Sequence, residues 1–206
     1  MTFKEAGLKP ELLRAIEELG FIKPTSIQEK IIPVILDSNP DLIAKAQTGT
    51  GKTAAFGLPL IQQSEIWSPE VQTLVLCPTR ELCVQIARDI ESYSKYTEGF
   101  RVTAVYGGAP ITNQINALRK GSHMVVGTPG RALDLIKRKK LDISLLRWLV
   151  LDEADEMLNM GFKEELDGIL ATSPAGKQTL LFSATMPKEV RKIADTYLNN
   201  PKEIKA

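Results

Sequence analysis

Residues Asp41–Leu58 read DLIAKAQTGTGKTAAFGL, in which an apolar segment leads into a glycine-containing loop and then into the start of a helix. A strand, a loop and a helix in this order are the setting of a phosphate-binding P-loop. Gly49 and Gly51 let backbone amides approach phosphate oxygens, and the N-terminus of the following helix attracts negative charge. We expect Lys52 to reach the β- and γ-phosphates of a nucleotide and the Thr53 hydroxyl to bind Mg2+.

One position of this loop departs from the general P-loop pattern. Ala46 stands where the pattern has glycine, which is tolerable if its φ is negative, and we take it as the mark of a subfamily. The alternative is a glycine-rich turn with an incidental Lys-Thr pair. The strand and the helix that flank the loop argue against that alternative.

A second segment, WLVLDEAD at Trp148–Asp155, ends an apolar run with acidic residues. The run Leu149–Leu151 does not alternate, as is typical of a strand buried on both faces of a parallel sheet. Asp152 then falls at the carboxyl end of that strand, where open α/β sheets bind ligands. We expect Asp152 to hold Mg2+ through its hydration shell and Glu153 to orient and deprotonate an attacking water. An acidic helix N-terminus that complements the helix dipole is the alternative, and both interpretations can hold together.

Apolar segments and helical patterns alternate along the whole chain. The predicted strands are Asp41–Lys45, Gln72–Cys77, Val102–Tyr106, Met124–Gly127, Trp148–Leu151 and Thr179–Phe182, with a further short strand possible near Glu203–Ile204. The predicted helices are Thr53–Glu65, Arg80–Tyr96, Ile111–Arg119, Arg131–Arg138, Glu164–Leu170 and Glu189–Tyr197. Such an alternation predicts an α/β fold, a parallel β-sheet with helices on both faces, of the P-loop NTPase class. We expect residues 1–206 to form a single domain.

The composition is compatible with this fold and sets limits on function. A formal net charge of +1 means that a nucleic-acid surface must be a local patch. No apolar run approaches the length of a membrane span and no signal peptide is visible, so we expect a soluble, cytoplasmic protein. Cys77 and Cys83 have no partners for a metal site and are interpreted as reduced thiols. The single histidine, His123, is interpreted as structural.

The segment before the P-loop, Gly20–Gln28, reads GFIKPTSIQ and leads from a turn into a helix. Thr25 and Gln28 have the spacing of a capping box, in which the glutamine reaches back to the start of its own helix. A glutamine amide also offers a donor and an acceptor that match N6 and N7 of adenine. The residues alone leave these two interpretations open.

Seven motifs taken together resemble the amino-terminal half of a DEAD-box RNA helicase in order and spacing. They are GFIKPTSIQ, AQTGTGKT (Ala46–Thr53), PTREL (Pro78–Leu82), the doublet Gly107-Gly108, TPGR (Thr128–Arg131), DEAD (Asp152–Asp155) and SAT (Ser183–Thr185). The resemblance implies a RecA-like fold, adenine selection by a glutamine motif within residues 1–29, ATP hydrolysis, and RNA held through its sugar-phosphate backbone. Ser26 and Cys83 stand where the family usually has proline and alanine.

The resemblance also implies a role for each matching residue. Gln28 is similar to the adenine reader, Phe21 to the aromatic residue that packs on the base, and Phe3 to an isolated upstream aromatic residue. The implied nucleotide-binding set is Phe3, Phe21, Lys23, Gln28, Ala46, Gln47, Thr48, Gly49, Thr50, Gly51, Lys52 and Thr53, with Lys52, Asp152 and Glu153 as catalytic residues and Thr53 and Asp152 at Mg2+. Ser183 and Thr185 resemble the element that couples hydrolysis to RNA binding, partly through hydrogen bonds toward Asp155.

Three motifs are implied to bind RNA: PTREL, the glycine doublet and TPGR. Their implied RNA-binding residues are Pro78, Thr79, Arg80, Gly107, Gly108, Thr128, Pro129, Gly130 and Arg131. Two of the motifs follow predicted strands and open helices, where free amides and an arginine favour sugar and phosphate over base edges. Taken singly, each motif is better explained as a helix start than as a nucleic-acid contact, and the RNA interpretation rests on all three lying at the carboxyl ends of strands in one sheet. Binding through such contacts is expected to be independent of RNA sequence and sensitive to salt.

The family's enzymes carry a second, similar domain, and no motif after Thr185 supplies it. We therefore expect this chain to be an isolated, monomeric domain of a larger helicase, which binds nucleotide and is nearly inactive without the missing carboxyl-terminal domain. A P-loop kinase of nucleotides or small molecules is one alternative and predicts an arginine-rich lid. A binding module that has lost catalysis is another, and the intact Lys52, Thr53, Asp152 and Glu153 argue against it.

Overall fold

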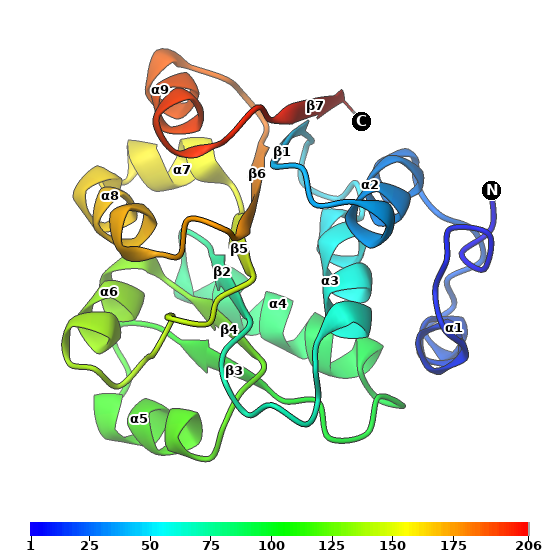
Figure 1. Ribbon diagram of the computed structural model, residues 1–206, viewed down its shortest axis with the longest axis horizontal. Helices are drawn as coiled ribbons and strands as arrows, with labels where there is room; N and C mark the ends of the chain where they lie inside the picture. The colour runs from blue at the N-terminus through cyan, green and yellow to red at the C-terminus, as the bar shows by residue number, and fades with distance from the viewer. Residues whose placement is uncertain (206) are drawn as a thin grey trace.

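The computed structural model describes residues 1–205, in which one parallel sheet lies between two layers of helices (Figure 1). The strands are β1 Leu42–Lys45, β2 Thr73–Leu76, β3 Val102–Val105, β4 Met124–Gly127, β5 Trp148–Leu151, β6 Gln178–Ser183 and β7 Lys202–Lys205. Their order across the sheet is β3-β4-β2-β5-β6-β1-β7, and all neighbouring pairs are parallel. The predicted fold class is confirmed, and each predicted strand is present, including the short one near Glu203.

Burial explains which segments became central strands. Every residue of β2, β4 and β5 is buried, as expected of non-alternating apolar runs covered by helices on both faces. The edge strand β7 differs, because only Ile204 is buried while Lys202, Glu203 and Lys205 are exposed. Charged side chains of this kind discourage pairing of a sheet edge with another chain.

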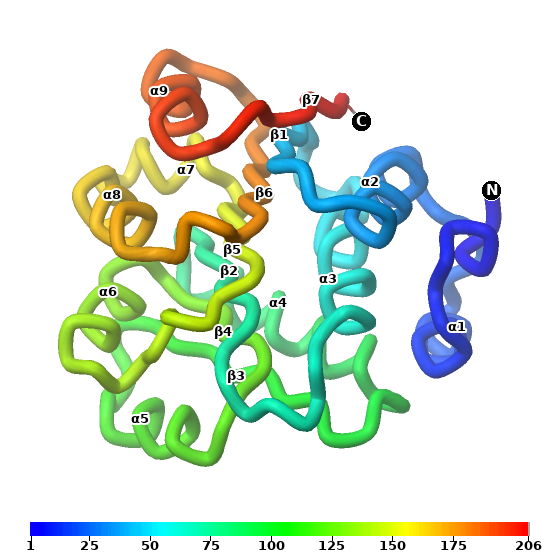
Figure 2. The backbone as a smooth tube through the Cα atoms, in the orientation of Figure 1, coloured from blue at the N-terminus to red at the C-terminus, as the bar shows by residue number. Residues whose placement is uncertain are grey.

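Helices α2 Ser26–Asp37, α3 Lys52–Gln63 and α4 Arg80–Tyr93 form one layer, and α1 Pro10–Glu18 packs outside α4. Helices α5 Ile111–Arg119, α6 Pro129–Lys137, α7 Ala154–Asn159, α8 Lys163–Thr172 and α9 Lys188–Tyr197 form the other layer. Figure 2 shows the chain beginning beside α1, at the outside of the first layer, and reaching the sheet edge at β7. None of the helices within residues 1–205 is long and apolar enough to cross a membrane.

The prediction was incomplete in the segment between β5 and β6. It gave one helix at Glu164–Leu170, whereas the structure contains α8 from Lys163 to Thr172 and, before it, the short helix α7. Helix α7 has six residues, too few to show an amphipathic period of its own. It begins directly after Glu153, so the acidic-helix interpretation of the DEAD segment is confirmed.

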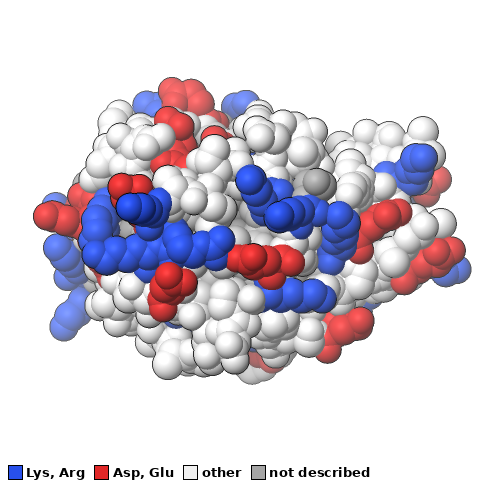
Figure 3. Space-filling model, turned by 90° about the horizontal axis from the view of Figure 1, so that it is seen from above, with Lys and Arg blue, Asp and Glu red and all other residues white. Residues whose placement is uncertain are grey.

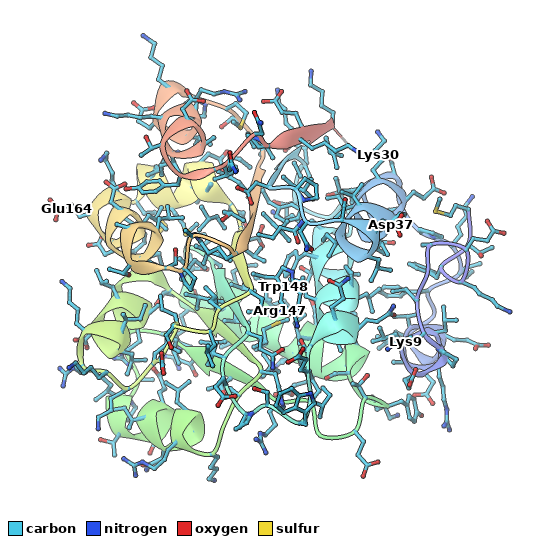
Figure 4. The ribbon with its side chains drawn as sticks, in the orientation of Figure 1. Lys9, Lys30, Asp37, Arg147, Trp148 and Glu164 are labelled. Carbon is cyan, nitrogen blue, oxygen red and sulfur yellow. The ribbon has the colours of Figure 1, made fainter. Side chains whose placement is uncertain are left out.

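Polar side chains fasten the edge of the sheet at which the strands begin. Arg147 lies with its guanidinium 4.3 Å from the centre of the Trp148 ring and donates to the Gln63 carbonyl at 3.1 Å, which ties the start of β5 to the end of α3 (Figure 4). The His123 Nδ1 accepts from the Arg101 amide at 3.0 Å, and its Nε2 lies 2.9 Å from the carbonyl of Ile66. The structural interpretation of His123 is therefore confirmed.

Candidate active site

The predicted phosphate loop connects β1 to α3 at the edge of the sheet where the strands end. The Ala46 amide donates to the Ser183 carbonyl at 3.2 Å, which joins the loop to the end of β6. Gly49 and Gly51 have φ values of +85° and +84°, a region that favours glycine. At Gly51 a Cβ atom would also lie 2.5 Å from Nε2 of Gln28, so any side chain there would displace the glutamine.

Lys52 and Asp152 meet beneath this loop. The Lys52 Nζ lies 3.0 Å from the Asp152 Oδ1, and the two residues are only 7% and 0% exposed. Burial raises the pKa of Asp152, and the charge of Lys52 opposes that rise. Beyond Lys52, neither Asp152 carboxylate oxygen has a hydrogen-bond partner within the residues that the structure describes. A buried carboxylate with free oxygens is suited to an ion or an ordered water.

The donors present fit Mg2+ that arrives with a nucleotide. Across residues 1–205 no group of three or more His, Cys, Asp or Glu side chains could hold a metal ion. Mg2+ commonly keeps several waters and takes one or two carboxylates together with substrate phosphates. Asp152 at the end of β5 and Thr53 in the first turn of α3 are the residues that would supply the protein's share.

Glu153 has an unusual backbone for its residue type. Its φ of +54° and ψ of +53° place it in the left-handed region, as the residue that caps the start of α7. Such a conformation costs roughly 1–3 kcal/mol in a residue other than glycine and is found at functional sites. Burial raises the pKa of its carboxyl group, neighbouring carboxylates add to the effect, and Lys52 opposes it. A raised pKa brings a carboxylate nearer to the range that suits a general base.

Asp155, Ser183 and Thr185 form one hydrogen-bonded cluster. The Asp155 Oδ2 accepts from the Thr185 amide at 3.0 Å and from its hydroxyl at 2.8 Å. The Ser183 hydroxyl accepts from the Asp155 amide at 3.2 Å and donates to the Thr185 carbonyl at 2.7 Å. Burial acts to raise the pKa of Asp155, but the hydrogen bonds, led by that from Thr185, leave it below its usual range. The contacts expected between the DEAD and SAT motifs are thus present.

Gln28 fulfils the capping-box interpretation and also reaches the phosphate loop. Its Oε1 accepts from the Thr25 amide at 2.9 Å, and its Nε2 donates to the Gly51 carbonyl at 3.1 Å. The Thr25 hydroxyl donates to the Thr50 carbonyl at 2.9 Å. The capping box is therefore confirmed, and the same two side chains support the loop that would hold phosphate.

The aromatic residues expected near a base lie against one another. The ring centres of Phe3 and Phe21 are 6.1 Å apart, and those of Phe21 and Tyr93 are 6.0 Å apart. Phe3 is buried and supports Phe21, which is partly exposed. A pocket of about 550 Å3 opens beside Phe3 and Phe21, and another of about 540 Å3 lies beside Thr25, Ala46 and Gln47. Lys23 is exposed and lies in the sequence between Ile22, which lines the first pocket, and Thr25, which lines the second.

The three motifs expected to face RNA come together beyond the ends of β2, β3 and β4. The Thr79 hydroxyl caps α4 by accepting from the Leu82 amide at 3.2 Å. Exposed Arg80 lies with its guanidinium 4.9 Å from the centre of the Tyr106 ring. Gly107 and Gly108 follow that ring and are exposed, with φ of +81° at Gly108.

The TPGR segment opens α6 in the same region. Thr128 stands at the N-cap position without a side-chain capping hydrogen bond, and its amide donates to the Val105 carbonyl at 3.0 Å, so the segment is fastened to β3. Pro129 is buried at the first helical position and Gly130 is exposed. Arg131 turns toward Gln114, with Nη1 and Oε1 separated by 2.8 Å.

Gln114 on α5 was missed by sequence reasoning. It is 7% exposed, and its Nε2 donates to the Tyr106 carbonyl at 3.1 Å. The signal was its position, because Ile111, Ile115 and Leu118 form an apolar stripe that includes residue 114. A polar residue on such a stripe must find partners in the interior.

Charge on the surface is mixed. Seen from above, lysine and arginine side chains form a band that is interrupted by aspartate and glutamate (Figure 3). The pattern agrees with the net charge of +1. Attraction of a polyanion to this domain therefore depends on local contacts and not on the charge of the whole molecule.

The family described as DEAD/DEAH box helicase matches residues 25–193 of the chain. The DEAD-box ATP-dependent RNA helicase CshA of Geobacillus kaustophilus is 49% identical over 204 residues, which are 99% of this chain and 43% of that protein. The ATP-dependent RNA helicase DeaD of Escherichia coli is 50% identical over 204 residues, 99% of this chain and 32% of that protein. The chain thus spans less than half the length of these relatives.

A solved structure gives the same result for the fold. The crystal structure of a DEAD box protein from the hyperthermophile Methanococcus jannaschii has a TM-score of 0.96 and 45% identity, covering 100% of this chain and 56% of that one. All of the described sheet and both helical layers therefore have a counterpart in a solved protein.

Proposed function

Because this chain belongs to the DEAD/DEAH box helicase family, we propose that it is the ATP-binding half of an ATP-dependent RNA helicase. One observation carries the proposal: Lys52 of the phosphate loop is paired at 3.0 Å with Oδ1 of the buried Asp152 of the DEAD motif, and the Asp152 Oδ2 has no hydrogen-bond partner within residues 1–205. The family match disfavours the small-molecule kinase that the P-loop alone left open. Cytoplasmic location and a monomeric domain stay predictions.

The nucleotide end of the site supports binding of ATP through charge and backbone amides. The N-terminus of α3 and Lys52 would receive the phosphates, and the residues Ala46–Gly51 would wrap around them. Bound Mg2+ would neutralise phosphate charge between Thr53 and Asp152. Adenine would lie near Phe21 and Lys23, where Gln28 keeps one amide hydrogen and one carbonyl lone pair beyond those used toward Gly51 and Thr25.

Glu153 is proposed to orient the attacking water and accept its proton. It follows Asp152 directly with a strained backbone, and its raised pKa suits proton transfer. Asp155, Ser183 and Thr185 would then link the reaction to the end of β6. RNA would be held by its sugar and phosphate groups at Pro78–Arg80, Gly107-Gly108 and Thr128–Arg131.

The second domain of the relatives is proposed to complete the site. An arginine finger raises rates by about 10³–10⁵ in related NTPases. We expect this chain alone to bind ADP weakly and to hydrolyse ATP at a background rate, with or without RNA. Joined to the carboxyl-terminal half of a close relative, which we call the two-domain protein, it should gain RNA-stimulated hydrolysis and unwind short duplexes.

Phosphate release by both proteins, measured with and without single-stranded RNA, tests this proposal. Robust RNA-stimulated hydrolysis by residues 1–206 alone would contradict the need for a second domain. A two-domain protein that releases no phosphate in response to RNA, or that transfers it to a small molecule, would contradict the helicase assignment itself.

A further inference from the structure

Two side chains from different helices form hydrogen bonds to the backbone of the loop Tyr106–Pro110 and hold it in place. Gln114 of α5 uses both ends of its amide on one residue: Oε1 accepts from the Tyr106 amide at 3.2 Å, and Nε2 donates to the Tyr106 carbonyl at 3.1 Å. Arg131 of α6 donates from Nη2 to the Ala109 carbonyl at 3.1 Å. The two holding residues are joined, because the Arg131 Nη1 donates to the Gln114 Oε1 at 2.8 Å.

These contacts leave the exposed doublet Gly107-Gly108 as the part of the loop that projects outward. Neither glycine carries a side chain, and the left-handed φ of Gly108 gives the loop a shape that other residues adopt at a cost. The doublet can offer RNA only its backbone groups. Backbone donors bind a phosphate well when they are held in place beforehand, since no order is then lost on binding.

Arg131 and Arg80 differ in how much of their guanidinium is free. Arg131 is half-buried and commits both terminal nitrogens to Gln114 and Ala109. Arg80 is exposed, lies over the Tyr106 ring at 4.9 Å, and comes within reach of Gly108. A guanidinium that is stacked on a ring keeps its N–H groups for a phosphate.

We propose that Gln114 and Arg131 are positioning residues that hold the Gly107-Gly108 loop ready for RNA, while Arg80 makes the charged contact with phosphate. The inference rests on the proposed RNA binding and goes beyond it by separating residues that touch RNA from residues that hold the loop. We call the two hydrogen bonds between the Gln114 amide and the Tyr106 backbone the Tyr106 clamp. Glutamine is required at position 114 because this clamp needs a donor and an acceptor. Glutamate would keep Arg131 but would face the Tyr106 carbonyl with a second acceptor.

The salt dependence of RNA affinity separates the two roles. A cation that neutralises a phosphate releases a counterion, so its removal lowers the slope of log affinity against log salt by about 0.7 for a single strand. Loss of a holding residue that does not itself contact phosphate lowers affinity without changing the number of released counterions, and this includes Arg131, whose guanidinium is committed to Gln114 and Ala109. In the two-domain protein we expect Arg80→Met to lower both the affinity and the slope. We expect Gln114→Met and Arg131→Met to lower affinity about tenfold, as one or two hydrogen bonds are lost, with the slope unchanged.

Two further variants test the clamp itself, and ADP affinity together with a control variant excludes a general loss of structure. Gln114→Glu should weaken RNA binding as Gln114→Met does, and the double variant Gln114→Met with Arg131→Met should bind no more weakly than the worse single variant. Affinity for ADP should stay at the wild-type value in all of them. Gln85→Met is the matched control, because the exposed Gln85 side chain forms a hydrogen bond to Asp89 of its own helix at 2.9 Å and no other within residues 1–205.

Four results would each overturn the inference while leaving the proposed function intact. Two are wild-type RNA affinities, in Gln114→Met or in Gln114→Glu. The others are a slope in Arg131→Met that falls as in Arg80→Met, and additive losses in the double variant. A wild-type two-domain protein that shows no salt-dependent RNA binding would instead contradict the proposed function, and the inference with it.

Discussion

Buried carboxylates at the two ends of the parallel strands, which are the two edges compared below, differ in how fully they are hydrogen-bonded. At the edge where strands begin, Asp41 accepts from the Thr179 amide through Oδ1 and from the Asn199 amide through Oδ2, each at 2.7 Å. At the edge where strands end, Asp152 is fully buried with a single cationic partner, and Glu153 has a strained backbone. A carboxylate that is satisfied stabilises the fold, whereas one that is left unsatisfied is available to a ligand.

The comparison teaches where stability and function are separable in this domain. Asp41 joins β1 to the start of β6 and to the turn before β7, so it acts on the sheet as a whole. Asp152 and Glu153 join nothing of that kind, and their environment raises the pKa of both carboxyl groups. Substitutions at the first edge should therefore change stability, and substitutions at the second should change chemistry.

The largest effect is expected from Glu153→Gln in the two-domain protein. Loss of the general base should slow ATP hydrolysis by about 10²-fold or more, with ATP still bound. Lys52→Ala is the contrasting variant, because it removes the main partner of the phosphates and should weaken nucleotide binding itself. Steady-state hydrolysis and nucleotide titration, measured side by side, distinguish the two. Normal hydrolysis by Glu153→Gln would show that another group activates the water.

Asp41→Ala should have the largest effect on stability. It leaves the buried amide of Thr179 and the partly buried amide of Asn199 without their acceptor, which costs about 2–4 kcal/mol in the free energy of unfolding. Urea denaturation of the 206-residue chain measures this loss. ADP affinity at low temperature, where the variant is folded, should match the wild type. An unchanged unfolding midpoint would break the contrast between the two edges.

Much of the architecture follows from the sequence because burial on both faces leaves a simple pattern. The strands around Leu74, Val125 and Val150 are apolar runs with no alternation, and their carboxyl ends locate the site. The placement of the P-loop and the DEAD segment at the same ends of the strands also follows, whereas the direct pairing of Lys52 with Asp152 is a finding of the structure.

Other features could not be predicted, for reasons that differ from residue to residue. Helix α7 is too short to show a period. The clamp of Gln114 on Tyr106 depends on how α5 returns beside β3, which no local pattern records. At Gln28 the sequence was ambiguous for a chemical reason: capping and adenine recognition use the same amide, and the structure contains the first of these.

Gln28→Ala measures how much adenine recognition by the Gln28 amide adds to nucleotide affinity. If the amide reads adenine, the chain should prefer ADP over GDP, and the substitution should remove about 1–3 kcal/mol of that preference. Loss of the capping box also lowers stability, by about 0.5–2 kcal/mol, and this effect is independent of the nucleotide offered. Calorimetric titration with both nucleotides separates the two effects, with Gln85→Met as control. Equal affinities of the unmodified chain for ADP and GDP would leave Gln28 as a helix cap alone.

The smallest expected effect is a gain. Glycine adopts a φ of +54° without the penalty that Glu153 carries, so Glu153→Gly should stabilise the chain by about 1 kcal/mol while it removes the proposed base. A gain of that size would show that the strain at the strand-end edge serves the reaction and not the fold. The matched control is Glu156→Gly, three residues further on and inside α7. Glycine there should lower the free energy of unfolding by about 1 kcal/mol, because the backbone is helical. Urea denaturation of the two variants should shift the midpoint in opposite directions. A loss of stability in both would mean that the Glu153 side chain makes contacts that outweigh its backbone strain, and the two edges would then differ in their chemistry alone.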